Sequence, residues 1–404
     1  MGGLAVVVIM AAGVTVLGIA RGWWGQGDVV GNSEGFRAAE APIGREGAAR
    51  WPEYGFDDRR TRANADLDLA PPFRTAWTHD AGSLLEFPPV VGGGRVIVGT
   101  NAGLALALDQ ETGEVRWRTR LRGRVASSAA LVGGDVVFTT TRGDLDVLDA
   151  ATGERRWRLR IGSSSESSPL VVDGDVYVGT LDGTILRIDM ETRRRVWTAR
   201  AAGDVKAGLA ASGNAVVVGD YGGQVSAFRR SDGRLAWRTE SPAPPLRGPG
   251  RFYAGPAVAY GRVYVGNING RVLALSASDG DVAWLRATND FVYSSAAVAD
   301  ETVYVGSYDR RLYALDAVSG RPRWSVDVGE RISGSPSVIG DLVYVSTIAR
   351  EPSEGITVAL DRRTGEERWR FPDGRYTPAV GVDGLLVLTG VRTLYGLVPA
   401  QTGG

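Results

Sequence analysis

Seven polar side chains recur at one position of a repeated unit that fills most of the chain. They stand three places before the Pro, Ala or Leu that opens an apolar stretch, and they are Glu86, Glu166, Lys206, Tyr253, Tyr293, Ser333 and Arg375. If the units form a ring, equivalent positions face the same opening. Converging acids, bases and tyrosines on separate elements favour a site for a polar ligand or a peptide.

A second interpretation of the same residues is charge pairing inside a wet channel, which stabilises a protein little. By order along the chain, Glu166 neighbours Lys206, and Arg375 neighbours Glu86 where a ring would close. The equivalent residue of the second unit, Ala126, carries no charge. We expect the residues to gather at one channel mouth under either interpretation.

Composition excludes several chemistries. The 404 residues include no cysteine and one histidine, His79, so disulfides, thiolate catalysis, a lipidated cysteine and a histidine metal cluster are excluded. The 46 basic residues balance 46 acidic ones, which argues against a nucleic-acid partner. Lys206, the only lysine, lies in no Gly-rich phosphate loop, and no G-x-S-x-G motif occurs. We predict no catalytic residue and no metal site.

Tryptophans at a near-constant period indicate a repeat architecture. Successive gaps are 40, 40, 40, 40, 47, 40 and 45 residues between Trp77, Trp117, Trp157, Trp197, Trp237, Trp284, Trp324 and Trp369. A period near 40 is typical of a solenoid, propeller or array. Short Val-, Ile- and Tyr-rich runs separated by Gly and Asp predict strands and hairpins, as in Asp175–Thr180 and Thr184–Asp189. Four strands in each unit predict propeller blades.

The number of blades follows from the two ends of the repeat. Eight tryptophans bound seven complete units, and the chain then supplies three more strands over 377–382, 385–389 and 393–398. Phe73–Thr78 precedes the first unit as an unpaired fourth strand. Joining the two ends makes an eighth blade and leaves no exposed sheet edge. The predicted fold is an all-β, eight-bladed propeller of four-stranded antiparallel blades, closed by the N-terminal strand.

The Asp of each A-L-D-x-x-T-G-x-x-x-W motif looks like part of an acidic array, but we interpret it as structural. A carboxylate at this place can accept turn N–H groups, and the following Gly supplies a positive φ. The motif Asp residues are Asp109, Asp149, Asp189, Asp316 and Asp361, whereas Arg229 and Ser276 replace Asp in two units and Arg193 replaces Gly in one. We expect each Trp to pack across to the next blade.

The N-terminal part reads as three segments. Leu4–Ala20 is an uncharged apolar run of about 25 Å as a helix, and Trp23 and Trp24 follow it. We predict that residues 1–24 are an uncleaved transmembrane helix, with a cleaved secretory signal as the alternative. Residues 25–50 are predicted to be a flexible linker and 51–72 a lead-in to the propeller at 73–404.

The motifs ALDQETGEVRW at 107–117 and ALDRRTGEERW at 359–369 resemble the PQQ-type β-propeller repeat of quinoprotein alcohol dehydrogenases and of the envelope lipoprotein BamB. The resemblance covers about residues 73–398. With its N-terminal apolar run, the whole chain also looks like membrane-anchored bacterial members of this family. The resemblance implies an eight-bladed ring, and for the enzymes a quinone held over the channel with a carboxylate-bound Ca²⁺. Glu166 is the only loose candidate for such a ligand. The disulfide of adjacent cysteines found in many of these enzymes has no counterpart here.

We therefore expect a non-catalytic binding or scaffold module without a cofactor, whose partner is a protein or envelope component. Its expected location is the cell membrane, single-pass, with a monomeric propeller on the extracytoplasmic side. One alternative is a PQQ-dependent alcohol or sugar dehydrogenase with PQQ and Ca²⁺. The other is an envelope protein assembly factor like BamB, although the missing cysteine argues against the same lipid attachment.

Overall fold

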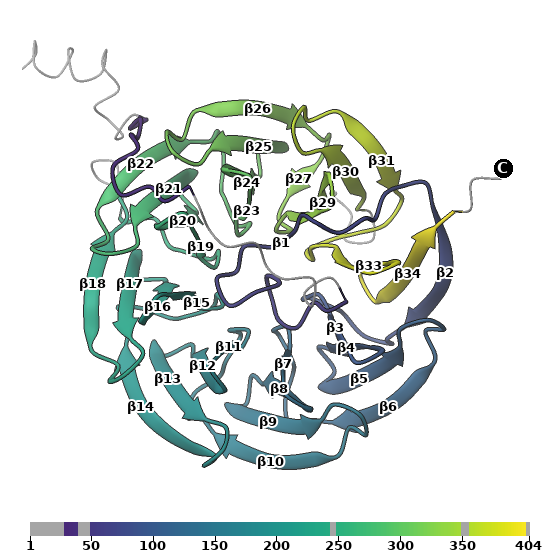
Figure 1. Cartoon of the computed structure of the whole chain (residues 1–404). Coiled ribbons are helices and arrows are strands. Elements are labelled where there is room, and N and C mark those ends of the chain that lie inside the picture. The colour runs from purple at the N-terminus through teal and green to yellow at the C-terminus, as the bar shows by residue number, and fades with distance from the viewer. Residues whose placement is uncertain (1–27, 39–48, 243–247, 349–354, 401–404) are drawn as a thin grey trace, which may run out of the picture.

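The repeat folds as a closed ring of blades around a central axis (Figure 1). The computed structural model describes residues 28–38, 49–242, 248–348 and 355–400. These residues form eight sheets of four or more strands, and the four strands that make up each blade pair antiparallel. The predicted all-β, eight-bladed propeller is confirmed.

Each of the first four blades follows chain order from the axis outward. Their strands are β3 (Val90–Gly92), β4 (Arg95–Gly99), β5 (Leu104–Asp109) and β6 (Val115–Arg120) in blade 1; β7 (Ala130–Val132), β8 (Asp135–Thr139), β9 (Asp144–Asp149) and β10 (Arg155–Arg160) in blade 2; β11 (Leu170–Val172), β12 (Asp175–Gly179), β13 (Thr184–Asp189) and β14 (Arg194–Arg200) in blade 3; and β15 (Ala210–Ser212), β16 (Ala215–Gly219), β17 (Gln224–Arg229) and β18 (Leu235–Glu240) in blade 4.

Blades 5 to 8 continue the pattern, and blade 7 gains two short strands, β1 (Ala63–Asn64) and β27 (Arg331–Ile332). The other strands are β19 (Ala257–Ala259), β20 (Arg262–Asn267), β21 (Arg271–Ser276) and β22 (Val282–Ala287) in blade 5; β23 (Ala297–Ala299), β24 (Thr302–Gly306), β25 (Arg311–Asp316) and β26 (Pro322–Asp327) in blade 6; β28 (Ser337–Ile339), β29 (Leu342–Ile348), β30 (Thr357–Asp361) and β31 (Glu367–Phe371) in blade 7; and β32 (Val380–Val382), β33 (Leu385–Thr389), β34 (Thr393–Pro399) and β2 (Phe73–Asp80) in blade 8.

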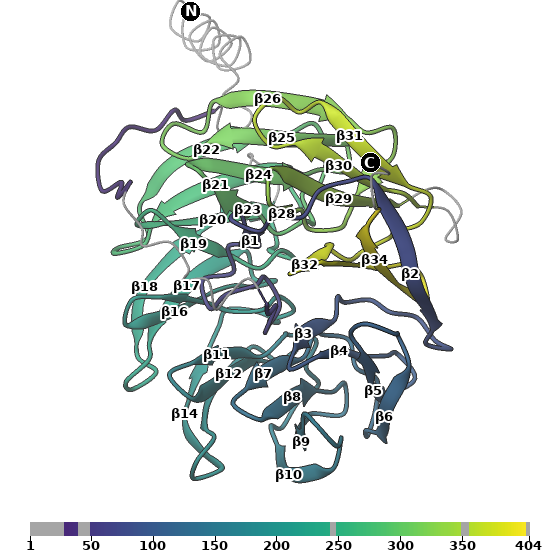
Figure 2. The ribbon, with the colours of Figure 1, turned by 45° about the vertical axis from the view of Figure 1, so that its right-hand side comes forward.

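The ring closes where the two ends of the repeat share a sheet. Strand β2 pairs antiparallel with β34 from Phe73 opposite Pro399 to Asp80 opposite Thr393. Figures 1 and 2 show these two strands side by side at the outer edge of blade 8. Because β2 supplies the outermost strand, blade 8 has the same four-stranded form as blade 1 beside it.

The tryptophans join successive blades, as expected. The Trp117 Nε1–H of blade 1 donates to the Ala150 carbonyl of blade 2 at 3.1 Å, and its ring lies on Gly153, whose φ is +74°. A Cβ on Gly153 would lie 2.5 Å from that ring, so only glycine allows the contact. Trp157 differs, because Arg193 takes the equivalent place in blade 3 with a φ of +59°.

The motif aspartates cap turns, which confirms the structural interpretation. Asp109 Oδ1 accepts the Glu111 and Thr112 N–H groups at 3.0 and 2.9 Å. The bond from Arg116, together with these turn N–H groups, lowers the pKa of Asp109 to about 2. Each of the other four motif aspartates likewise accepts a turn N–H, these residues being Asp149, Asp189, Asp316 and Asp361.

Residues 51–64, here called the inner segment, cross the middle of the ring (Figure 1). The innermost strand of a blade has N–H groups that face the axis and need acceptors. The inner segment visits the blades in chain order and makes at least one hydrogen bond to each. These contacts are Val91 N–H to Trp51 O, Leu131 N–H to Pro52 O, Val171 N–H to Glu53 Oε2, Ala211 N–H to Asp58 O, Val258 N–H to Arg59 O, Val298 N–H to Thr61 O, Val338 N–H to Arg62 O, and Asn64 Nδ2 to Gly381 O.

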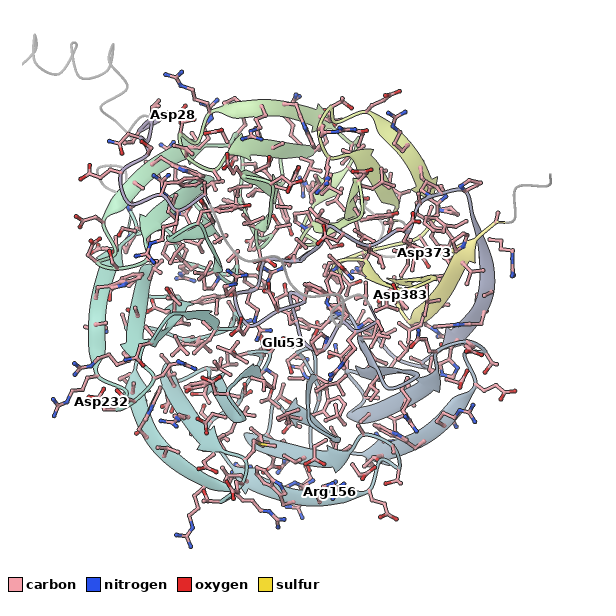
Figure 3. The ribbon with its side chains drawn as sticks, viewed as in Figure 1. Asp28, Glu53, Arg156, Asp232, Asp373 and Asp383 are labelled. Atoms are coloured by element: carbon pink, nitrogen blue, oxygen red, sulfur yellow. The ribbon has the colours of Figure 1, made fainter. Side chains whose placement is uncertain are left out.

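A buried ion pair holds the inner segment. Arg60 Nη1 lies 2.9 Å from Glu53 Oε2, and the two side chains are 0% and 7% exposed. Arg60 also donates to the carbonyls of Tyr54, Pro169 and Leu209. Figure 3 shows Glu53 near the centre of the ring. Arg60 therefore ties the inner segment to the connections that enter blades 3 and 4.

We predict that Glu53 makes stability depend on pH. Burial raises the pKa of Glu53 to about 7, against the opposing effects of Arg60 and the Val171 N–H. An acid whose folded-state pKa is raised contributes stability that is complete below its unfolded pKa and is lost as the pH rises. The urea midpoint of the wild type minus that of Glu53→Gln should therefore decrease as the pH is raised from about 5 to about 7. A difference that stays constant or grows over this range would contradict the prediction.

The predicted N-terminal segments are only partly described. Residues 1–24, predicted as an anchor or signal, lie outside the described residues, and within those described no helix is long and apolar enough to cross a membrane. Residues 28–38 of the expected linker lie against blades 5 and 6. Val29 bridges Leu285 of β22, and Asp28 pairs with Arg286 at 2.7 Å. Figure 3 places Asp28 at the outer edge of the ring.

Candidate functional site

A cavity of about 350 Å³ lies at the axis of the ring and is called the cup here. Its wall comes from the connections that lead into the innermost strands, and its floor includes Tyr54 of the inner segment. The connection into each of the eight blades contributes at least one residue to this wall. The cup therefore has the position that the repeat predicted for a convergent site, with the inner segment packed across the axis beneath it.

Six of the seven predicted residues line the cup. These are Glu86, Glu166, Lys206, Tyr253, Tyr293 and Ser333. The seventh differs by one residue, since Tyr376 and not Arg375 lines the wall in blade 8. Pro378 occupies the position of Pro88, so the apolar stretch of blade 8 opens at Ala379, one residue later than predicted. Arg375 instead donates from Nη2 to the Tyr376 hydroxyl at 2.7 Å.

The charges in the cup are arranged unevenly. Lys206 Nζ pairs with Glu166 Oε2 at 2.8 Å, as their order in the repeat predicted. Ala126 of blade 2 is buried, and Arg124, two residues earlier, lines the cup in its place. Glu86 also lines the cup and forms no ion pair within the described residues. The cup thus offers separate acidic and basic groups on the side formed by blades 1 to 4.

Aromatic rings make up the wall on the side of blades 5 and 6. Tyr253 and Tyr293 lie edge to face with centroids 5.2 Å apart, and Tyr293 and Tyr308 lie 4.8 Å apart. Burial, with Glu166 and Glu86 nearby, raises the pKa of Tyr253 to about 12. Its hydroxyl is therefore protonated at neutral pH and can donate a hydrogen bond to a ligand.

Tyr54 in the floor is held from several sides. Its hydroxyl lies 3.1 Å from Ser335 Oγ, and the buried Arg62 guanidinium lies 4.6 Å from its ring centroid. Burial alone would raise the pKa of Tyr54, but Arg62 and the hydrogen bonds to Ser335 and Ser295 outweigh it and lower the pKa. Tyr54 is thus fixed in place by a buried guanidinium and by hydroxyl groups from the wall connections.

Small residues tie the wall connections to one another. The Ser295 N–H of blade 6 donates to Ser335 Oγ of blade 7 at 3.0 Å, and the Gly255 N–H of blade 5 donates to Ser295 Oγ at 2.9 Å. Ser128 and Ser168 make the same contact between blades 2 and 3. These bonds fix the wall residues two places earlier in each connection.

Several wall residues were not predicted. Tyr308 lies in the turn after the second strand of blade 6, and its N–H donates to Phe291 O, which brings that turn beside the connection carrying Tyr293. Comparing the second residue after each second strand would have revealed Tyr308 and its equivalent Tyr221. Tyr54 had no signal of this kind, because the inner segment is not part of the repeat.

The cup does not fit a carboxylate-bound Ca²⁺. Of its two glutamates, Glu166 is engaged by Lys206, and Glu86 lies two blades away. No three His, Cys, Asp or Glu side chains gather closely enough to share a metal ion in the part of the chain that the structure describes. His79 lies on the outer strand β2, away from the cup.

We predict that the Lys206–Glu166 pair contributes little to stability. The two side chains are 27% and 20% exposed, and ion pairs in contact with solvent contribute about 0–1 kcal/mol. Lys206→Met should change the free energy of unfolding by less than about 1 kcal/mol, measured by urea denaturation. Glu166→Gln is the matched variant. A loss above about 2 kcal/mol in either would show that the pair serves the fold.

Comparisons with known proteins agree with this architecture. The family model described as outer membrane protein assembly factor BamB matches residues 71–138, 126–245, 196–290 and 288–400. Comparison with curated protein sequences gave no match.

Similar solved structures include two dehydrogenases and one assembly factor. The quinohemoprotein alcohol dehydrogenase from Comamonas testosteroni has a TM-score of 0.73 and 17% identity over 89% of this chain and 83% of that chain. BamB from Moraxella catarrhalis has a TM-score of 0.67 and 18% identity, covering 81% and 100%. A europium-containing methanol dehydrogenase has a TM-score of 0.72 and 13% identity, covering 87% and 98%. At these identities the likeness shows the fold alone.

Proposed function

The chain belongs to the family of the outer membrane protein assembly factor BamB, and from that premise we propose that it is a non-catalytic binding module that holds a protein or envelope component in the cup. The observation that carries the proposal is the convergence of six repeat-equivalent side chains on one cavity. Converging polar and aromatic groups on a rigid ring are typical of recognition sites.

The mixture of side chains favours recognition over chemistry. Tyrosine and arginine are enriched at the centres of protein interfaces, and the cup combines Tyr253, Tyr293 and Tyr376 with Arg124. The Lys206 amine is neutralised by Glu166, so neither group is poised as a base or a nucleophile.

We further propose that the apolar run Leu4–Ala20 holds the module at the cell membrane as a single-pass anchor, with the propeller on the extracytoplasmic side. In that arrangement the cup would present its ligand site to the cell envelope. The module would act as a monomer, since β2 completes the ring within one chain.

The single lysine makes this proposal directly testable. Lys206 lines the cup and is the only lysine in the chain, so an amine-reactive, photoactivatable crosslinker can be attached at one side chain inside the cup. The full-length chain carrying this probe should capture a discrete partner from envelope fractions. A matched probe, placed through Arg74→Cys on β2 in the Lys206→Arg background, should not capture it. Identical capture by both probes would remove the cup from the proposal.

The rival function predicts a different result. A PQQ-dependent dehydrogenase would bind PQQ with Ca²⁺ saturably and would oxidise an alcohol or a sugar with a dye as electron acceptor. We expect neither saturable binding nor turnover, because the cup does not gather carboxylates for the ion. Tight binding with turnover would overturn the proposed function.

A further inference from the structure

Five aromatic rings form a continuous row, and three of them, Tyr253, Tyr293 and Tyr308, line the cup. The row, here called the aromatic row, consists of Tyr221, Tyr253, Phe291, Tyr293 and Tyr308. Tyr221 and Tyr253 are 6.2 Å apart, and Phe291 contacts both Tyr293 and Tyr308 at 5.8 and 6.3 Å. The rings come from blades 4, 5 and 6, so the fold and not one loop builds the row.

Two rings of the aromatic row are open to solvent. Tyr253 is 41% exposed and Phe291 44% exposed, and the other exposed large hydrophobic side chains of the described residues are all aliphatic. Exposed aromatic patches rimmed by polar residues mark interaction sites, because covering them removes apolar surface from water. The row therefore gives the cup a preferred side for an apolar part of its ligand.

Both ends of the row carry a guanidinium. The Arg251 guanidinium lies 5.9 Å from the Tyr221 ring centroid, and the Arg331 guanidinium lies 5.9 Å from the Tyr308 ring centroid. Neither arginine forms an ion pair within the described part of the chain, and both are exposed. Lys206 also lies over Tyr221 and Tyr253, but Glu166 neutralises it.

We propose that the aromatic row binds a peptide segment in which apolar side chains are flanked at both ends by acidic residues. This inference rests on the proposed function and names the chemistry of its partner. The aromatic rings between the two ends favour apolar side chains, while the two guanidiniums, which form no ion pair in the described part of the chain, favour a carboxylate at each end, where Arg can bind bidentately.

The test is a reversal of charge at the two ends. An array of random 12-residue peptides is probed with the full-length chain, and the bound peptides should be enriched in Asp or Glu on both sides of apolar residues. Arg251→Glu combined with Arg331→Glu should turn the enrichment toward Lys and Arg at those positions. Arg74→Glu on β2 is the matched control and should leave the wild-type enrichment unchanged.

A second variant tests the middle of the row. Tyr253→Ala should weaken a selected acidic and apolar peptide by about 30-fold, the size expected for an interface hot spot. Both arginines and Tyr253 are exposed, so the urea midpoints should match the wild type and exclude unfolding as the cause.

The remaining outcomes each overturn the inference. They are an array without bound peptides, an enrichment that survives the charge reversal, and a selected class without acidic residues. Each of these is distinguishable from failure of the proposed function, because capture of a partner through Lys206 would still show that the cup binds a ligand of another kind.

Discussion

Replacing Arg60 with methionine is expected to lower the free energy of unfolding by about 3–5 kcal/mol. The substitution leaves the buried Glu53 carboxylate without its cation and the carbonyls of Pro169 and Leu209 without a donor. Breaking a buried ion pair costs this much because one charge stays desolvated. Urea denaturation of the full-length chain would measure the change as a lower midpoint at an unchanged m value.

Two controls separate the ion pair from other effects of the Arg60 substitution. Arg116→Met removes an arginine that pairs with Asp109 at 2.6 Å on the outer surface, where Arg116 is 53% exposed, and should lower the urea midpoint far less than Arg60→Met does. Glu53→Leu combined with Arg60→Met removes both charges and should recover part of the loss. A methionine variant as stable as the wild type would show that the inner segment does not depend on the pair.

The loss at Arg60 should also depend on pH. Without the guanidinium, the Glu53 pKa rises further above its ordinary value, since burial then acts unopposed by Arg60. At pH 5 Glu53 can take up a proton, whereas at pH 8 folding must bury more of the charge. The destabilisation by Arg60→Met should therefore be smaller at pH 5 than at pH 8. The opposite order would contradict the assignment of Glu53 as the group left unpaired.

The repeat made the ring and most of the cup predictable. A Trp period near 40, four strands in each unit and an unpaired strand at each end determine a closed eight-bladed ring, because each unit must bury both faces against neighbours. Equivalence of positions then places Glu86, Glu166 and Lys206 at one mouth without any knowledge of side-chain directions. The register failed only in blade 8, where Pro378 stands one place earlier than the residue that opens the other stretches.

The inner segment could not be predicted in the same way. Its residues follow no period, and its buried Glu53, Arg60 and Arg62 look like surface residues in the sequence. They are buried because the innermost strands of successive blades point N–H groups at the axis. These groups need hydrogen-bond acceptors, and the non-repeating inner segment supplies them. Tyr54 reaches the cup only as a consequence of that path.

Trp284→Ala is expected to cost about 3–5 kcal/mol of stability, the range for truncation of a buried Trp. Trp284 is 0% exposed, and its Nε1–H donates to the Ala317 carbonyl of blade 6 at 2.9 Å. Its ring lies on Gly320, and Gly31 covers it from the N-terminal segment that crosses blade 5. The loss should appear as a lower urea midpoint of the full-length chain.

Trp157→Ala is the matched control for this prediction. Trp157 occupies the same place in blade 2, but it is only half-buried, and Arg193 stands in the place of the glycine on which the Trp284 ring lies. Folding removes less apolar surface of Trp157 than of Trp284 from water. The loss of stability for Trp157→Ala should therefore be at least about 1 kcal/mol smaller than for Trp284→Ala. Equal losses of stability at the two positions would show that the contact between the Trp284 ring and Gly320 contributes nothing to the free energy of unfolding. A larger loss at Trp284 would show that the N-terminal segment and the turn glycine together strengthen the joint between blades 5 and 6.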